Sequence, residues 1–130
     1  MEFSTVRIVE WDSIVRDGLM LLSILGFILN LCLLTLGGLR LRRTGTARPF
    51  AAAMLVHSLM LLLVVLFFIS WRLSDAYLAV AAAGPSIAHA VMLNATTGAY
   101  LKSFALSLPA IAIGVSGAIA LHTGAKTNRN

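Results

Sequence analysis

Two long stretches without a formal charge constrain this chain more than any other feature. Gly18 to Leu39 contains no charged residue, and Phe50 to Trp71 contains none apart from a proton that His57 can take up. A membrane-spanning helix needs about 20 mainly apolar residues, because hydrocarbon offers an exposed peptide group no hydrogen-bond partner. A shorter stretch, Phe104 to Leu121, is also uncharged and is rich in small residues. We therefore predict an all-α membrane protein with transmembrane helices at 18–39, 50–71 and 104–121.

The remaining residues are too few for an extramembrane domain. Of the 130 residues, 59% are hydrophobic and 12% are charged, which is far from the balance of a soluble protein. We expect one membrane domain whose other parts are an interfacial lead-in (1–17), a basic loop (40–48), an outer segment that contains a helix (72–103) and a tail (122–130). A fourth span stays possible, because 76–101 carries no formal charge. Gly84-Pro85 and the polar residues that follow favour three spans.

Basic residues predict the orientation of these helices. Arginines cluster directly after the first span, and such clusters mark the cytoplasmic side of a membrane protein: Arg40, Arg42, Arg43 and Arg48. The acidic amino terminus then lies outside, and the carboxyl end, with Lys126 and Arg129, returns to the cytoplasm. Since this N-out, C-in arrangement accounts for the net charge of +5, we expect the lipid bilayer as a partner and no nucleic acid.

Small and polar residues inside the spans predict helix packing. Ala110, Gly114 and Ala118 recur at intervals of four residues, with Ser107 nearby. Such spacing lets two helix backbones approach closely, which in lipid replaces the missing hydrophobic drive. Asn30 lies near the middle of the first span and must find a partner there. The packing can occur within one chain or between copies, and the latter would make a homo-oligomer.

No motif of a soluble enzyme is present in the sequence. Paired carboxylates, Cys/His metal spacing, a phosphate loop and a nucleophile with a base in reach are all missing, so we expect no enzyme, no metal and no cofactor. His57 leaves three interpretations open: a neutral side chain bonded to a neighbouring helix, a proton relay, or a ligand in a haem- or quinone-binding anchor. The haem needs a second axial ligand at equal depth, and neither His89 nor His122 is well placed for it. We interpret Cys32, inside the first span, as an apolar packing residue.

The stretch LAVAAAGPSIAHAVMLNATTGAY, residues 78–100, resembles the start of the last membrane helix in the MotA/TolQ/ExbB proton-channel family. The resemblance rests on proline, isoleucine and alanine positions, on a threonine-containing stretch and on a Pro-Ala pair: Pro85, Ile87, Ala88, Ala90, Thr96-Thr97-Gly98 and Leu108-Pro109-Ala110. His89 stands where the family often has Glu. The chain would be a shortened relative, because the nine residues 40–48 replace the family's large cytoplasmic domain.

This resemblance implies a small oligomeric subunit of a proton-driven energy-coupling channel in a bacterial inner membrane. Copies of the chain would form a ring around a single-span partner helix that carries the essential Asp. Polar side chains of this chain would line the path beside that helix: Thr96, Thr97, Asn94 and His57. The alternative is an accessory or anchor subunit of a larger membrane complex with a packing role only, in contact with its partner through the apolar side of 50–71.

Overall fold

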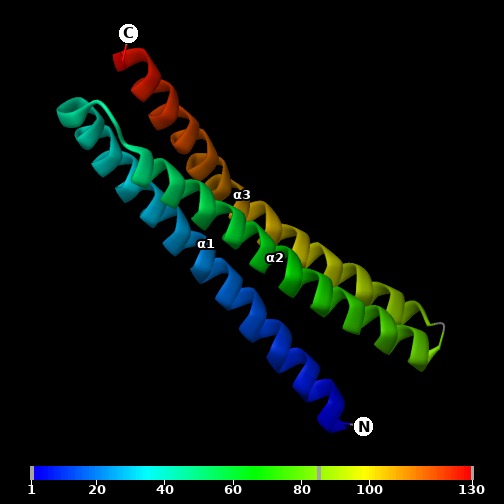
Figure 1. Cartoon of the computed structure of the whole chain (residues 1–130). Helices are drawn as coiled ribbons and strands as arrows, with labels where there is room; N and C mark the ends of the chain where they lie inside the picture. The colour runs from blue at the N-terminus through cyan, green and yellow to red at the C-terminus, as the bar shows by residue number, and fades with distance from the viewer. Residues whose placement is uncertain (1, 85, 130) are drawn as a thin grey trace.

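The computed structural model describes the backbone of residues 2–84 and 86–129 and the side chains of residues 12–84 and 86–124. The described backbone forms three helices, α1 (Glu2–Thr44), α2 (Arg48–Ala83) and α3 (Ile87–Arg129) (Figure 1). All three are long and apolar enough to cross a membrane. The prediction of an all-α chain with three apolar helices long enough to span a membrane is thus confirmed for the described residues. The region considered as a fourth span is divided between the ends of α2 and α3.

Each helix is longer than the span predicted inside it. α2 has 36 residues, or about 54 Å at 1.5 Å per residue, whereas the hydrocarbon core is about 30 Å thick. Within the segment expected as an outer connection, residues 72–83 and 87–103 are helical, because that segment has no helix breaker before Gly84. That residue has φ 89°, a conformation suited to glycine, and its amide donates to the Val80 carbonyl. The lead-in continues α1 without a break, although its side chains at 1–11 lie outside the described residues, as do those at 125–130 of the tail.

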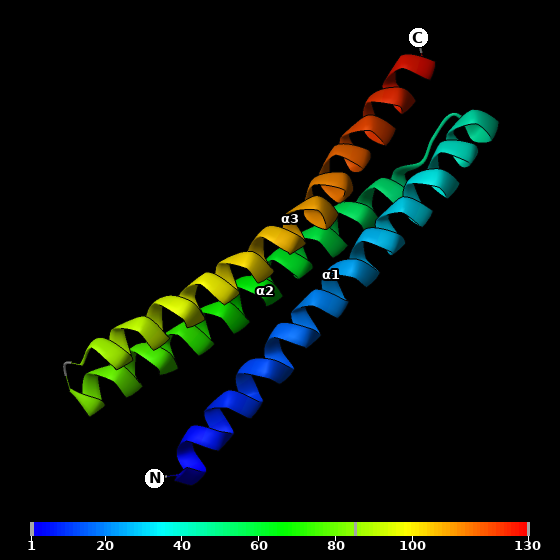
Figure 2. The same cartoon turned by 180° about the vertical axis from the view of Figure 1, so that it is seen from behind.

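α2 and α3 form an antiparallel hairpin, and α1 packs across it. The amino-terminal half of α1 diverges from the hairpin in both views (Figures 1 and 2). α3 bends between its yellow and orange parts (Figure 2), in the region that holds Pro109. Proline has no amide to donate and its ring displaces the preceding carbonyl, so it kinks a helix.

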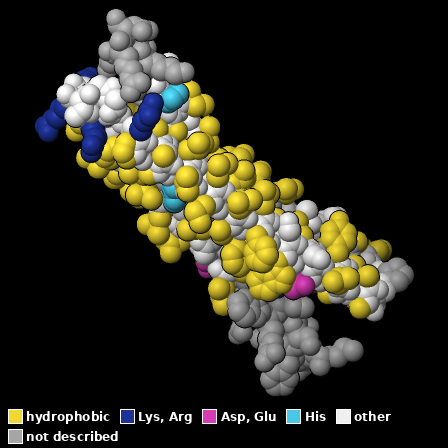
Figure 3. Space-filling model, viewed as in Figure 1, with side chains coloured by type: hydrophobic (Ala, Val, Ile, Leu, Met, Phe, Trp, Pro, Cys, Tyr) yellow, Lys and Arg dark blue, Asp and Glu magenta, His cyan; other side chains and the backbone are white. Residues whose placement is uncertain are grey.

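Two apolar clusters form the interior of the bundle. The larger lies toward the amino-terminal end of α1 and contains Val15, Leu19, Leu61, Val65, Ile69, Tyr100 and Ala110. The smaller lies near the α1–α2 connection and contains Ala47, Met54, Ala118 and Leu121. Outside these clusters, hydrophobic side chains cover most of the face seen in Figure 3, and basic side chains gather at one end. Such a surface is compatible with contact to a lipid bilayer.

Candidate functional site

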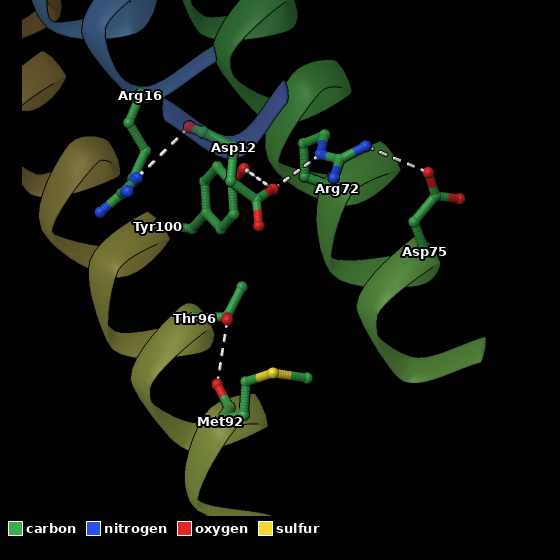
Figure 4. A network of polar contacts seen from close by, with 7 residues as sticks. All are labelled: Asp12, Arg16, Arg72, Asp75, Met92, Thr96 and Tyr100. Atoms are coloured by element: carbon green, nitrogen blue, oxygen red, sulfur yellow. Dashed lines mark hydrogen bonds and ion pairs between the residues drawn. The ribbon is translucent and has the colours of Figure 1, made fainter. Parts of the chain in front are cut away.

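One carboxylate joins all three helices. Asp12 of α1 accepts a hydrogen bond from Arg72 Nε of α2 at 2.8 Å and another from the Tyr100 hydroxyl of α3 at 2.6 Å, both on Oδ1 (Figure 4). Arg72 is 4% exposed and Asp12 17% exposed, and Tyr100 is fully buried. Charge-assisted hydrogen bonds of this kind are the strong ones in proteins. The network therefore fixes the three helices at one level.

Further contacts hold Arg72 in this position. Its Nη1 pairs with Asp75 Oδ2 at 3.2 Å, one helical turn along α2, and its guanidinium carbon lies 5.2 Å from the centroid of the Trp71 ring. Arg16, on the other side of Asp12, donates from Nε to the Asp12 main-chain carbonyl (Figure 4). Because buried charges are tolerated only when they are paired and hydrogen-bonded, this arrangement serves to hold the helices together.

Sequence reasoning missed this network. It places Asp12 in the interfacial lead-in and both Arg72 and Tyr100 in the outer segment, and it gives none of the three a role. Arg72 and Tyr100 lie 60 and 88 positions after Asp12 in the sequence, so no local pattern connects the three residues. A usable signal was present, since opposite charges lie just beyond the outer ends of two spans predicted to be antiparallel neighbours.

A second polar cluster lies in the middle of the bundle. Asn30 Nδ2 of α1 donates to the Ala110 carbonyl of α3 at 2.9 Å and to Ser58 Oγ of α2 at 3.4 Å. Asn30 and Ser58 are completely buried. Asn30 Oδ1 has no hydrogen-bond partner. The cluster needs Gly114, because a Cβ atom there would lie 1.7 Å from Ser58 Oγ.

The residues predicted to pack helices all lie inside the chain's own bundle. Ala110, Ala118, Ser107 and Asn30 are buried, as is Gly114. Ala110 and Gly114 contact Asn30 through the polar cluster, and Ala118 belongs to the smaller apolar cluster. The Ser107 hydroxyl donates to the Phe104 carbonyl. The small-residue face that they form is thus used within one chain.

The residues predicted to line a channel are not brought together. The Thr96 and Thr97 hydroxyls donate to the Met92 and Leu93 carbonyls of their own helix, and Asn94 is exposed. His57 of α2 lies elsewhere, against Gly26 of α1. A Cβ atom built at Gly26 would lie 3.3 Å from His57 Nε2 and 3.9 Å from Ala110 Cβ, so His57 is at the level of Ala110. Since Ala110 is 14 positions beyond Thr96, the two regions are about 21 Å apart along α3.

The three histidines occupy separate parts of the bundle. His57 Nε2 is buried without a hydrogen-bond partner, His89 Nδ1 lies 3.2 Å from the Gly84 carbonyl, and His122 lines a groove with Arg48 at the opposite end. Among the described residues, no group of three or more His, Cys, Asp or Glu side chains could hold a metal ion. This distribution does not fit a haem with two histidine ligands.

The basic residues predicted to set topology lie at the end of α1 and the start of α2 (Figure 3): Arg40, Arg42, Arg43 and Arg48. The Arg40 guanidinium lies 6.0 Å from the Phe50 ring centroid, where α2 begins. Arg42 and Arg43 occupy the last turn of α1, a position in which positive charge offsets the partial negative charge of the helix end.

No protein-family model, curated protein or solved structure matches this chain. A function for this chain is therefore inferred from the arrangement of its own residues.

Proposed function

We propose that this chain is an accessory or anchor subunit of a larger membrane complex, one that assembles by lateral helix packing and catalyses no reaction. The supporting observation is a second face of small residues on α3. It consists of exposed residues at helical spacing, Ala105, Ala112, Ser116 and Ala120, and Pro109 lies at its edge, where it also lines a recess shared with α1. The Ser116 hydroxyl donates to the Ala112 carbonyl at 2.7 Å, which reduces its polarity toward lipid.

The outward face of α2 has the opposite character. Large side chains recur there at helical spacing, and all are exposed: Val56, Met60, Leu63 and Phe67. Large apolar side chains are suited to lipid, whereas small residues allow a second helix to come close enough for extensive van der Waals contact. We therefore assign the partner contact to the outward face of α3, not to the apolar side of 50–71.

In this proposal the chain lies in a bacterial inner membrane with its amino terminus outside. The Arg40–Arg48 cluster would then be cytoplasmic, and the Asp12–Arg72–Tyr100 network would lie near the outer boundary. Support comes from the uncharged residues that separate them, since Gly18 to Leu39 spans about 33 Å, close to the thickness of the hydrocarbon core.

Native mass spectrometry of the protein released gently from its own membranes tests this proposal. We expect one copy of the chain bound to a different membrane protein at fixed stoichiometry. Ala112→Phe and Ser116→Phe should abolish that complex, because a large ring on the outward face holds the two backbones apart. Val56→Phe adds a similar ring to the outward face of α2 and should leave the complex intact.

All three variants should keep the thermal unfolding temperature of the parent, since each site is exposed. A chain that is released alone, or a complex that survives both α3 variants and is lost with Val56→Phe, would contradict the assignment.

A second candidate is the energy-coupling channel subunit. The observation that favours it is a recess of about 160 Å³ in which Thr96 lies beside Asp12, Arg16 and Tyr100. A threonine next to a carboxylate at the end of an apolar helix fits a hydrated path. In the same mass spectrum, this candidate requires a closed ring of identical chains around a single-span partner.

A further inference from the structure

A groove lies between α1 and α3, in the half of the bundle that contains Asp12. It consists of three recesses that share lining residues. The first recess lies beside Asp12, and it shares Arg16 and Ala99 with a middle recess of about 490 Å³. The middle recess shares Met20 and Leu106 with a deeper one of about 300 Å³. The groove is therefore continuous from the level of Asp12 to that of Ala110.

The groove ends in the middle of the bundle. There Asn30 Nδ2 of α1 donates to the Ala110 carbonyl of α3 and ties the two helices together. From Lys102 to Ala110 is eight residues of α3, or about 12 Å, which is close to half of the hydrocarbon thickness of about 30 Å. The apolar part of the groove is thus one leaflet deep, too short to receive a helix that crosses the whole membrane.

The lining of the groove changes from charged residues in the middle recess to mainly apolar residues in the deeper one. Arg16 and Lys102 line its middle recess together with Asp17, so the local charge is positive by one. The Asp12 carboxylate is paired with Arg72 at 2.8 Å, and Asp75, which shares that arginine, does not line the recesses. Below this level the lining is mainly apolar, and the two serines there, Ser103 and Ser23, donate to carbonyls of their own helices.

We propose that this groove binds one anionic phospholipid from the leaflet at the Asp12 end of the bundle. The phosphate lies between Arg16 and Lys102, and an acyl chain runs along Met20 and Leu106 toward Ala110. A cationic rim above an apolar channel one leaflet deep matches the polarity and length of such a lipid, and basic residues near a membrane surface attract anionic lipid. The floor has free space, since a Cβ atom at Gly98 would meet nothing within 4 Å.

Native mass spectrometry tests this site on the full chain, purified in detergent and mixed with equal amounts of dioleoyl phosphatidylglycerol and dioleoyl phosphatidylcholine. We expect one phosphatidylglycerol to be retained in preference to phosphatidylcholine. Arg16→Gln or Lys102→Gln should each weaken its retention about fivefold, as expected for removal of one interfacial cation. Asp17→Asn should strengthen it by a similar factor, because a competing negative charge is removed.

Two further variants separate this groove from general charge attraction. Gly98→Leu keeps both cations but fills the groove, and it should reduce phosphatidylglycerol retention at least as much as Lys102→Gln. Arg42→Gln removes a cation of the cluster at the other end and should have no effect.

Equal retention of the two lipids would overturn the proposal. Retention that depends on Arg42 and not on Lys102 would also overturn it. So would a chain dimer that disappears with Gly98→Leu, because the occupant of the groove would then be a second copy. Far-ultraviolet circular dichroism of each variant confirms that the helices remain formed.

Discussion

Arg72 is the residue on which the three-helix network depends. It is almost fully buried, and its partners Asp12 and Tyr100 belong to the two other helices. Arg72→Leu should lower the free energy of unfolding by about 3–5 kcal/mol, because it leaves the Asp12 carboxylate buried without a counter-ion. Unfolding in detergent, followed by circular dichroism against increasing denaturant, measures this loss.

Asp75 provides a matched control at the same arginine. Its side chain is 46% exposed, and exposed ion pairs contribute at most about 1 kcal/mol, so Asp75→Asn should have a small effect. The double variant Asp12→Leu/Arg72→Leu should recover most of the loss, since no buried charge remains. Equal losses for Asp75→Asn and Arg72→Leu would show that the network adds no stability of its own.

At the scale of elements, Gly114 decides how closely α3 approaches α2. A Cβ atom there would lie 1.7 Å from Ser58 Oγ and 2.7 Å from Asn30 Nδ2, so Gly114→Ala should force the helices apart and lower the thermal unfolding temperature. Gly38→Ala is the control, because a Cβ atom there meets nothing within 4 Å. It should be neutral or stabilise by up to about 1 kcal/mol through better helix propensity.

Ser58→Gly removes the side chain that Gly114→Ala meets. The double variant should therefore be more stable than Gly114→Ala alone, and failure of this recovery would mean that the tight contact lies elsewhere.

The sequence predicted the elements of this fold better than the contacts between them. Hydropathy located the three apolar segments, because that signal is local, but the predicted span at 50–71 ends twelve residues before α2 does. The predicted helices are too short at their ends. The alanine-rich residues at 79–83, for example, favour a helix although they are not part of a predicted membrane span. Asp12, Arg72 and Tyr100 could not be connected from the sequence, because their pairing depends on how the helices align with one another in space. The hydroxyls of Thr96 and Thr97 donate to carbonyls of their own helix, a pairing that hydropathy does not reveal.

For the whole molecule, the proposed orientation makes a prediction about chemical labelling. In a Cys32→Ala background, Ser86→Cys at the α2–α3 connection should react with a membrane-impermeant maleimide added to intact cells, because the proposed orientation puts that connection outside. Thr46→Cys at the α1–α2 connection should react only in inverted vesicles, because the arginines around it favour the cytoplasm. The reverse pattern would show that the chain is inserted with its amino terminus inside.

The polar contacts of α1 also bear on the biogenesis of this protein. Asn30 donates to a carbonyl 80 residues further along, and Asp12 binds a tyrosine 88 residues further along. A ribosome makes α1 long before it completes α3, so these side chains enter the bilayer before their α3 partners exist. Release of α1 into lipid must therefore be followed by a separate step in which the hairpin closes over it. A nascent chain arrested before that step would present an asparagine to hydrocarbon, where an unpaired polar group is costly.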